Sequence, residues 1–82
     1  RGKKPIQRNA LIALGHFKEE SSLPDLVEVL LNDPRSEIRA TAAWSVGQID
    51  SKESEKFLLQ ARQTEKDEEV LREIEHALSN RI

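Results

Sequence analysis

The chain has 82 residues, of which 37% are hydrophobic and 34% are charged, and its formal net charge at pH 7 is −2. A chain of this length supports one hydrophobic core, and its three Gly and three Pro residues are too few for a loop-rich all-β fold. Because cysteine is absent, disulfides, thiolate metal sites and a cysteine nucleophile are excluded. No apolar run reaches the roughly 20 residues that cross a bilayer, and no signal peptide opens the chain, so we expect a cytoplasmic protein without membrane contact.

The first five residues, Arg1 to Pro5, are predicted to form a basic, extended lead-in. Pro5 disfavours a helical conformation for the residue before it, and Gly2 is a weak helix former. The chain starts without Met and ends at Ile82 while a helical pattern is still running. We therefore expect a piece of a longer protein, in which residues 1–5 lead in from a missing upstream domain.

Five helices are predicted after this lead-in, at about residues 6–16, 22–32, 35–48, 51–64 and 67–80. In each segment the apolar residues recur at spacings of three and four, which places them on one face of an α-helix. Residues that favour helix starts mark the boundaries. The expected capping residues are, in chain order, Ser22, then Ser36 or Asp33, then Asp50 or Ser51, and then Thr64 or Asp67.

Two glycines, Gly15 and Gly47, lie near the ends of the first and third predicted helices. Helices commonly end on a residue with positive φ, and glycine adopts that conformation without strain. The sequence therefore predicts that these two glycines terminate their helices in the left-handed conformation.

The sequence also repeats itself with a period of 32 residues. Shifted by this amount, residues 6–17 fall on residues 38–49, and the matching pairs are Ile6/Ile38, Ala10/Ala42, Leu11/Ala43, Leu14/Val46, Gly15/Gly47 and Phe17/Ile49. The same shift leads on to a weaker third copy with Val70, Ile74 and Leu78. Repeats of this length are typical of helix pairs that stack and share one core. We predict one all-α domain over residues 6–82, an α-α superhelix or solenoid of about five helices in two and a half antiparallel pairs, with repeats at about 6–34, 35–66 and, in part, 67–82.

Small residues in the first and third helices predict how closely the helices approach. These residues are Ala10, Ala13, Ala40, Ala42 and Ala43. Their short side chains would give the two helices thin flanks, against which neighbouring helices pack closely. The fifth helix is rich in Glu and is expected to cap the array with a solvated outer face.

Residues 38–49, Ile-Arg-Ala-Thr-Ala-Ala-Trp-Ser-Val-Gly-Gln-Ile, resemble the inner helix of short bacterial HEAT repeats. The opening, residues 1–15, resembles the start of the C-terminal HEAT-like domain of epoxyqueuosine reductases. That family reduces epoxyqueuosine on tRNA in the last step of queuosine synthesis, with a cobalamin and two 4Fe-4S clusters held upstream. The resemblance implies a HEAT-like module that has no cofactor of its own and that helps the missing catalytic domain to hold tRNA.

Nine residues are candidates for contact with nucleic acid: Arg1, Lys3, Lys4, Arg8, His16, Lys18, Arg35, Arg39 and Trp44. The first 18 residues contain five Lys or Arg residues and no Asp or Glu. This charge suits contact with phosphates, and the alternative is that the segment is a solvated linker. Trp44 falls away from the apolar arc of its helix, so it would either stack on an unpaired base or pack between helices. His16 suits the end of a helix dipole as well as a phosphate. Arg39 occupies a position where HEAT repeats often carry an arginine that bridges successive turns through carboxylates or carbonyls.

Two functions remain open for a chain in which no catalytic constellation is recognisable. The first is a non-catalytic tRNA-docking module, in which the first and third helices face the nucleic acid and the acidic fifth helix faces away. The second is a protein–protein interaction scaffold of the HEAT-repeat type. It is favoured by the net acidity of the chain, and it would use exposed Leu and Val edges or the acidic surface of the second and fifth helices. Residues 19–34 contain Glu19, Glu20, Asp25, Glu28 and Asp33 and no Lys or Arg.

Overall fold

The computed structural model describes residues 7–79, and its regular structure consists of five α-helices and one short 3₁₀ turn. The helices are α1 (Arg8–Phe17), α2 (Leu23–Asn32), α3 (Ser36–Gln48), α4 (Lys52–Thr64) and α5 (Glu68–Ser79), and the turn η1 (Glu20–Ser22) precedes α2. Over the described range every helix lies within two residues of its predicted position, so the all-α prediction is confirmed. Ile6 and the predicted basic lead-in, residues 1–5, lie outside the described residues.

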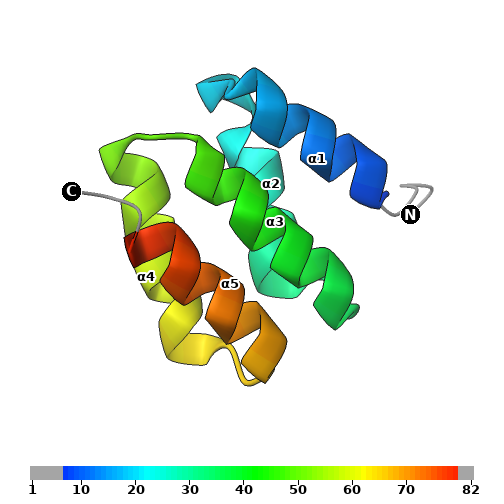
Figure 1. Cartoon of the computed structure of the whole chain (residues 1–82), viewed down its shortest axis with the longest axis vertical. Coiled ribbons are helices and arrows are strands. Elements are labelled where there is room, and N and C mark those ends of the chain that lie inside the picture. The colour runs from blue at the N-terminus through cyan, green and yellow to red at the C-terminus, as the bar shows by residue number, and fades with distance from the viewer. Residues whose placement is uncertain (1–6, 80–82) are drawn as a thin grey trace.

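The helices form two layers (Figure 1). Helices α1, α3 and α5 lie side by side in one layer, and α2 and α4 lie behind them. Helix α3 is at the centre, because it packs against α1 and α5 within its own layer and against α2 in the other. Each repeat thus adds one helix to each layer, as the 32-residue period predicts.

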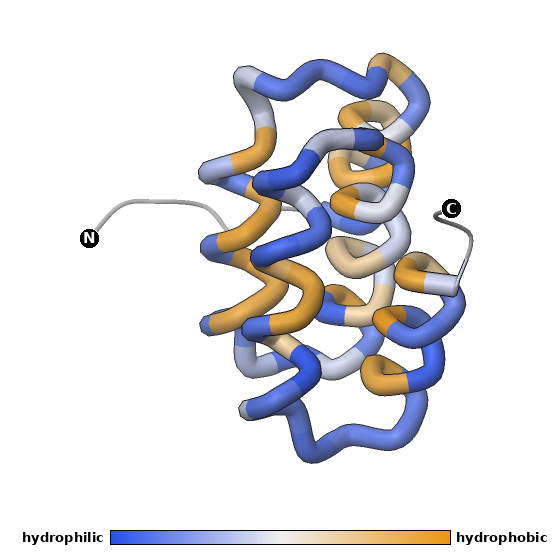
Figure 2. The backbone as a smooth tube through the Cα atoms, turned by 90° about the vertical axis from the view of Figure 1, so that its left-hand side faces the viewer, coloured by the Kyte–Doolittle hydropathy of each residue, from blue (hydrophilic) through white to orange (hydrophobic). Residues whose placement is uncertain are grey.

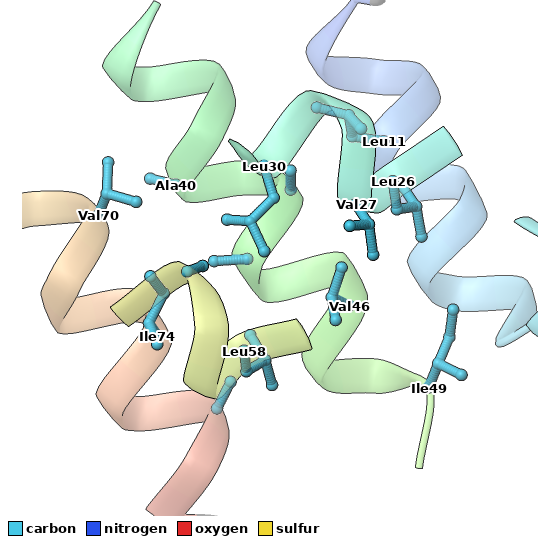
Figure 3. Packing of buried hydrophobic residues seen from close by; sticks show 14 of the residues in the cluster. Leu11, Leu26, Val27, Leu30, Ala40, Val46, Ile49, Leu58, Val70 and Ile74 are labelled. Carbon is cyan, nitrogen blue, oxygen red and sulfur yellow. The ribbon is translucent and has the colours of Figure 1, made fainter. Parts of the chain in front are cut away.

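The core lies between the two layers (Figure 3). Leu11 of α1, Leu30 of α2 and Leu58 of α4 are at most 1% exposed, and the repeat positions Val46, Val70 and Ile74 are completely buried. Figure 2 shows the hydrophobic residues recurring along the helices and the hydrophilic ones gathered in the loops at both ends of the bundle. The matching copies therefore supply one continuous core.

The first copy is less buried than its repeat pattern predicts. Ala10 and Ala13, expected on a close-packed flank, are exposed, and Phe17 is 73% exposed. The prediction of thin flanks holds for Ala40, Ala42 and Ala43 of α3, which are buried. The physical reason is position, because α1 lies at the edge of its layer with α3 on one side, whereas α3 has a helix on each side.

The helix starts follow the predicted capping residues in two cases. Ser51 caps α4 through a capping box with Ser54. Asp67 caps α5, since its Oδ1 accepts hydrogen bonds from the backbone N–H groups of Glu69 at 2.9 Å and Val70 at 3.4 Å. Ser22 precedes α2 without a side-chain capping bond, and α3 begins after Arg35 rather than with a Ser36 cap.

The two glycines do not terminate their helices, so that prediction was wrong. Gly15 lies within α1 and Gly47 within α3, and the residue with positive φ is Lys18, at φ 54° and ψ 39°. Both glycines instead permit close approach: a Cβ on Gly15 would lie 2.6 Å from the Trp44 ring, and one on Gly47 would lie 2.6 Å from the Cβ of Ala77. The missing side chains let α1 and α5 contact α3 closely.

We expect Gly47→Ala to lower the free energy of unfolding by about 1 to 2 kcal/mol, because overpacking costs about 1 to 3 kcal/mol and the better helix propensity of alanine returns part of it. The new Cβ would meet Ala77 on the facing helix α5. Urea denaturation of the wild-type chain and the variant measures the difference. A second substitution, Ala77→Gly, removes the opposing Cβ, so the clash is absent from the double variant, in which the gain of helix propensity at position 47 offsets the loss at position 77. The double variant should therefore lose less stability than the sum of the two single variants, and a strictly additive loss would contradict this packing.

Candidate nucleic-acid interface

The face of the α1–α3–α5 layer carries a groove of about 320 Å³, which we call the Trp44 groove. It crosses all three helices of the layer and is lined by Arg8, Ile12 and His16 of α1, by Glu37, Ala40, Thr41 and Trp44 of α3, and by Glu69 and Glu73 of α5. Its volume falls within the range of ligand-binding clefts. The groove therefore brings three of the predicted contact residues, Arg8, His16 and Trp44, to one surface.

Trp44 is half-buried between α1 and α3. The ring edge packs against Gly15, and the His16 ring meets it edge-on, with ring centroids 5.5 Å apart and an interplanar angle of 73°. Edge-to-face pairs at this distance are a favourable aromatic geometry. Trp44 also lines the groove. Trp44 thus packs α1 against α3 and forms part of the groove wall.

The groove is more acidic than the sequence pattern predicted. Helix α5 was expected to face away from the nucleic-acid side, but Glu69 and Glu73 line the same groove as Trp44. The reason is that α5 lies beside α3 in the same layer, so residues 32 positions apart, such as Glu37 and Glu69, occupy equivalent places. Sequence reasoning did not predict Glu69 and Glu73 as groove residues, although the 32-residue period relates Glu69 to Glu37.

Among the residues that line the groove, the basic ones, Arg8 and His16, both come from α1. Arg8 and Lys18 are exposed at the two ends of α1, about 15 Å apart at 1.5 Å per residue. Lys18 forms the left-handed terminus of the helix, and its N–H donates to the carbonyls of Leu14 and Gly15. The predicted contact residues Arg1, Lys3 and Lys4 lie outside the described residues.

Arg35 is held in the loop between α2 and α3 by the carboxylate of Asp33. Its Nε and Nη2 donate to this carboxylate at 3.0 and 2.9 Å, and its backbone N–H donates to Oδ1 at 2.9 Å. The hydrogen bond from the Arg35 side chain is the largest influence on Asp33, and it holds the pKa of that carboxyl below its ordinary value although burial opposes it. A guanidinium engaged in this way is a weaker phosphate ligand than an uncommitted one.

Arg39 bridges two loops, which is the structural role that its position suggested. Its Nε and Nη2 each donate to the Glu65 carboxylate at 3.0 Å, and its Nη1 donates to the Asp33 carbonyl at 2.7 Å. Asp33 and Glu65 are 32 residues apart, so the arginine ties one repeat to the next. The Arg39 side chain is 18% exposed and the Glu65 side chain 6% exposed. The hydrogen-bond donors of Arg39 therefore stabilise the two loops.

The pKa of Glu65 is lowered by this bridge. Burial alone would raise the pKa of the carboxyl, but hydrogen bonds from Arg39 and from the backbone N–H groups of Asp67 and Lys66 favour the charged form and outweigh it. The Arg39 pKa is raised in turn by the hydrogen bond to Glu65. Both groups are thus held ionised in the folded protein.

Between residues 7 and 79 no three His, Asp or Glu side chains are grouped so that they could hold a metal ion. None of the helices in that range has the length and apolar character needed to cross a membrane.

Comparison with known proteins places these features in a wider context. The protein family described as HEAT repeats matches residues 2–79. Epoxyqueuosine reductases from Bacillus anthracis and Bacillus subtilis are each 53% identical over 78 residues, which is 95% of this chain and 20% of the relative. This chain thus spans about a fifth of the length of the curated relatives that it matches.

Solved structures agree with these sequence matches. A crystal structure of epoxyqueuosine reductase superposes with a TM-score of 0.84 at 52% identity, over 96% of this chain and 21% of that one. Another epoxyqueuosine reductase, solved with an epoxyqueuosine-modified tRNA-Tyr stem loop, gives a TM-score of 0.83 at 51% identity, over 95% of this chain and 21% of that one.

Proposed function

Since this chain belongs to the HEAT repeat family, and its sequence is similar to a segment of epoxyqueuosine reductases over nearly its whole length, we propose that it is the tRNA-docking part of such an enzyme. In this proposal the chain is non-catalytic and acts together with the catalytic part of the same enzyme. The observation that carries the proposal is the pair of exposed cations, Arg8 and Lys18, at the two ends of α1. The relative solved with a tRNA stem loop supports the choice of ligand.

The proposed contact runs along α1. Arg8 and Lys18 neutralise phosphates at the two ends of the helix. Arg1, Lys3 and Lys4, which precede α1 in the sequence, add further positive charge for phosphate contact. Such contacts position a nucleic acid without reading its sequence. We leave Arg35 and Arg39 out of the contact set, because carboxylates hold their guanidinium groups.

The Trp44 groove contacts a base rather than a phosphate in this proposal. Glu37, Glu69 and Glu73 repel phosphate, whereas carboxylates accept hydrogen bonds from the amino groups of bases. The indole of Trp44 supplies a surface on which an unpaired base can stack, with His16 beside it.

The 4Fe-4S clusters that the resemblance implies do not fit this chain. Iron–sulfur clusters are held by Cys thiolates, and the chain contains no Cys. On this proposal the cofactors belong to the remaining four-fifths of the enzyme, and the residues described here hold substrate only.

A chimaera tests the proposal: this chain replaces the matching segment of the Bacillus subtilis epoxyqueuosine reductase, and binding of a tRNA stem loop is titrated at several salt concentrations. The double variant Arg8→Gln/Lys18→Gln should weaken binding and reduce the slope of log Kd against log salt by about 1.5, since each phosphate contact contributes roughly 0.7 to 0.9. Adding Arg1→Gln, Lys3→Gln and Lys4→Gln should reduce the slope further.

The matched control is Lys52→Gln/Lys56→Gln, which removes the same charge from exposed positions of α4 in the other layer. This variant should leave the slope unchanged. Equal effects of the two double variants, or no effect of either, would overturn the proposed contact along α1.

A further inference from the structure

A second hollow, of about 420 Å³, lies between α2 and α4 in the layer opposite the Trp44 groove. Its walls are almost entirely apolar and come from Leu23, Pro24 and Val27 of α2 and from Phe57 of α4. Leu23 and Val27 are buried and belong to the hydrophobic core, while Phe57 is half-buried. This α2–α4 groove therefore presents an apolar floor that the fold itself leaves open.

Carboxylates stand on both sides of the α2–α4 groove. Glu20 of η1 lines one side and Glu53 of α4 the other. The whole segment of residues 19–34, which supplies η1 and α2, carries five acids and no Lys or Arg. Lys52 and Lys56 of α4 line a different hollow together with Leu59.

We infer that the α2–α4 groove is a docking site for a basic amphipathic segment of a protein partner, in which apolar side chains enter the groove and flanking Lys or Arg side chains pair with Glu20 and Glu53. The apolar floor supplies burial, and the acidic rims select the charge of the partner. Nucleic acid and anionic lipid surfaces do not suit the site, because their phosphates would face these carboxylates. A second copy related by a twofold axis would bring the same acidic rims together, which also disfavours it.

This site is independent of the proposed tRNA contact. It lies in the other layer, on helices that contribute nothing to the Trp44 groove. A chain with both surfaces could hold nucleic acid on the α1 side and a basic protein segment on the α2–α4 side.

The test uses the 82-residue chain and a fluorescently labelled peptide of roughly twelve residues, with Leu at spacings of three and four and Lys elsewhere. Fluorescence anisotropy should detect saturable binding of this peptide and none of a matched peptide with Glu in place of Lys. The variant Glu20→Lys/Glu53→Lys should weaken binding about tenfold. The control Glu28→Lys/Glu55→Lys makes the same charge change at exposed positions outside the groove and should have little effect.

The apolar floor is tested separately. Phe57→Ala should weaken peptide binding, whereas Leu59→Ala, two residues further along α4 and outside the groove, should not; melting temperatures establish that each variant is folded. The proposal is overturned if the two charge-reversed variants lose affinity equally, or if the acidic peptide binds as well as the basic one. It is also overturned if sedimentation shows that the chain self-associates and that Phe57→Ala abolishes this association.

Discussion

Leu58→Ala is expected to lower the free energy of unfolding by about 3 to 4 kcal/mol, within the range measured when a large buried aliphatic side chain is cut to Ala. Leu58 is completely buried in α4, where Figure 3 shows it in the core between α3 and α5. Because a domain of this size has one core, no second cluster compensates for the cavity. Chemical denaturation followed by circular dichroism measures the change.

The neighbouring residue provides the control for this prediction. Leu59 has the same side chain on the same helix but is 38% exposed. Leu59→Ala should therefore cost less than about 1 kcal/mol, since surface substitutions have small effects. Equal losses for the two substitutions would contradict the placement of α4 in the structure.

Glu65→Ala is expected to cost about 3 kcal/mol, at the low end of the range for removing one partner of a buried ion pair. The substitution leaves the largely buried guanidinium of Arg39 without its two carboxylate acceptors, and it also removes the acceptor of the Asp67 N–H. Thermal and chemical denaturation measure the loss. The control is Glu75→Ala, which breaks the exposed pair with Arg62 and should cost less than about 1 kcal/mol.

The same bridge makes stability depend on pH. The pKa of Glu65 is lower in the folded protein than the ordinary value of about 4.3 expected in the unfolded chain. The stabilisation is therefore fully present above that ordinary value and is lost as the pH falls through the folded pKa. The melting temperatures of the wild-type chain and Glu65→Ala should differ most near neutral pH and converge in acid; a constant difference would contradict the assignment.

Local signals in the sequence were sufficient for the helices and their order. The apolar spacing of three and four residues located each helix, and Ser51 and Asp67 marked two of the starts correctly. The 32-residue period placed Val46, Val70 and Ile74 in one core, where all three are buried. These features depend on residues close in sequence or on exact repetition, which a single sequence reveals.

Features that depend on the neighbour of a helix could not be predicted in this way. The role of Gly15 is set by Trp44 and that of Gly47 by Ala77, which no local pattern connects to the glycines. Ala13 is a small residue typical of a packed flank but is exposed, because α1 lies at the edge of its layer and packs against α3 on one side. The bridging partner of Arg39 was expected to be a carboxylate or carbonyl, and only the packing of the two loops identifies Glu65.

The candidate site was predicted in part. Arg8, His16 and Trp44 do come together, yet Glu37 of α3 was assigned no role in the groove. Glu69 and Glu73 were missed because α5 was expected to cap the array and face outward. In a solenoid, equivalent positions of successive repeats share one face. The period that identified the fold therefore also determines the charge of the groove, through Glu37 and Glu69.

Trp44 is the single tryptophan of the chain, and it lies in contact with α1 while lining a groove whose far wall is α5. A change in the superhelical curvature of the array would alter the spacing of these two outer helices and with it the solvation of the indole. Intrinsic fluorescence excited at this one chromophore therefore provides a label-free gauge of bending, which can be followed in real time while ligands are added to either side of the molecule.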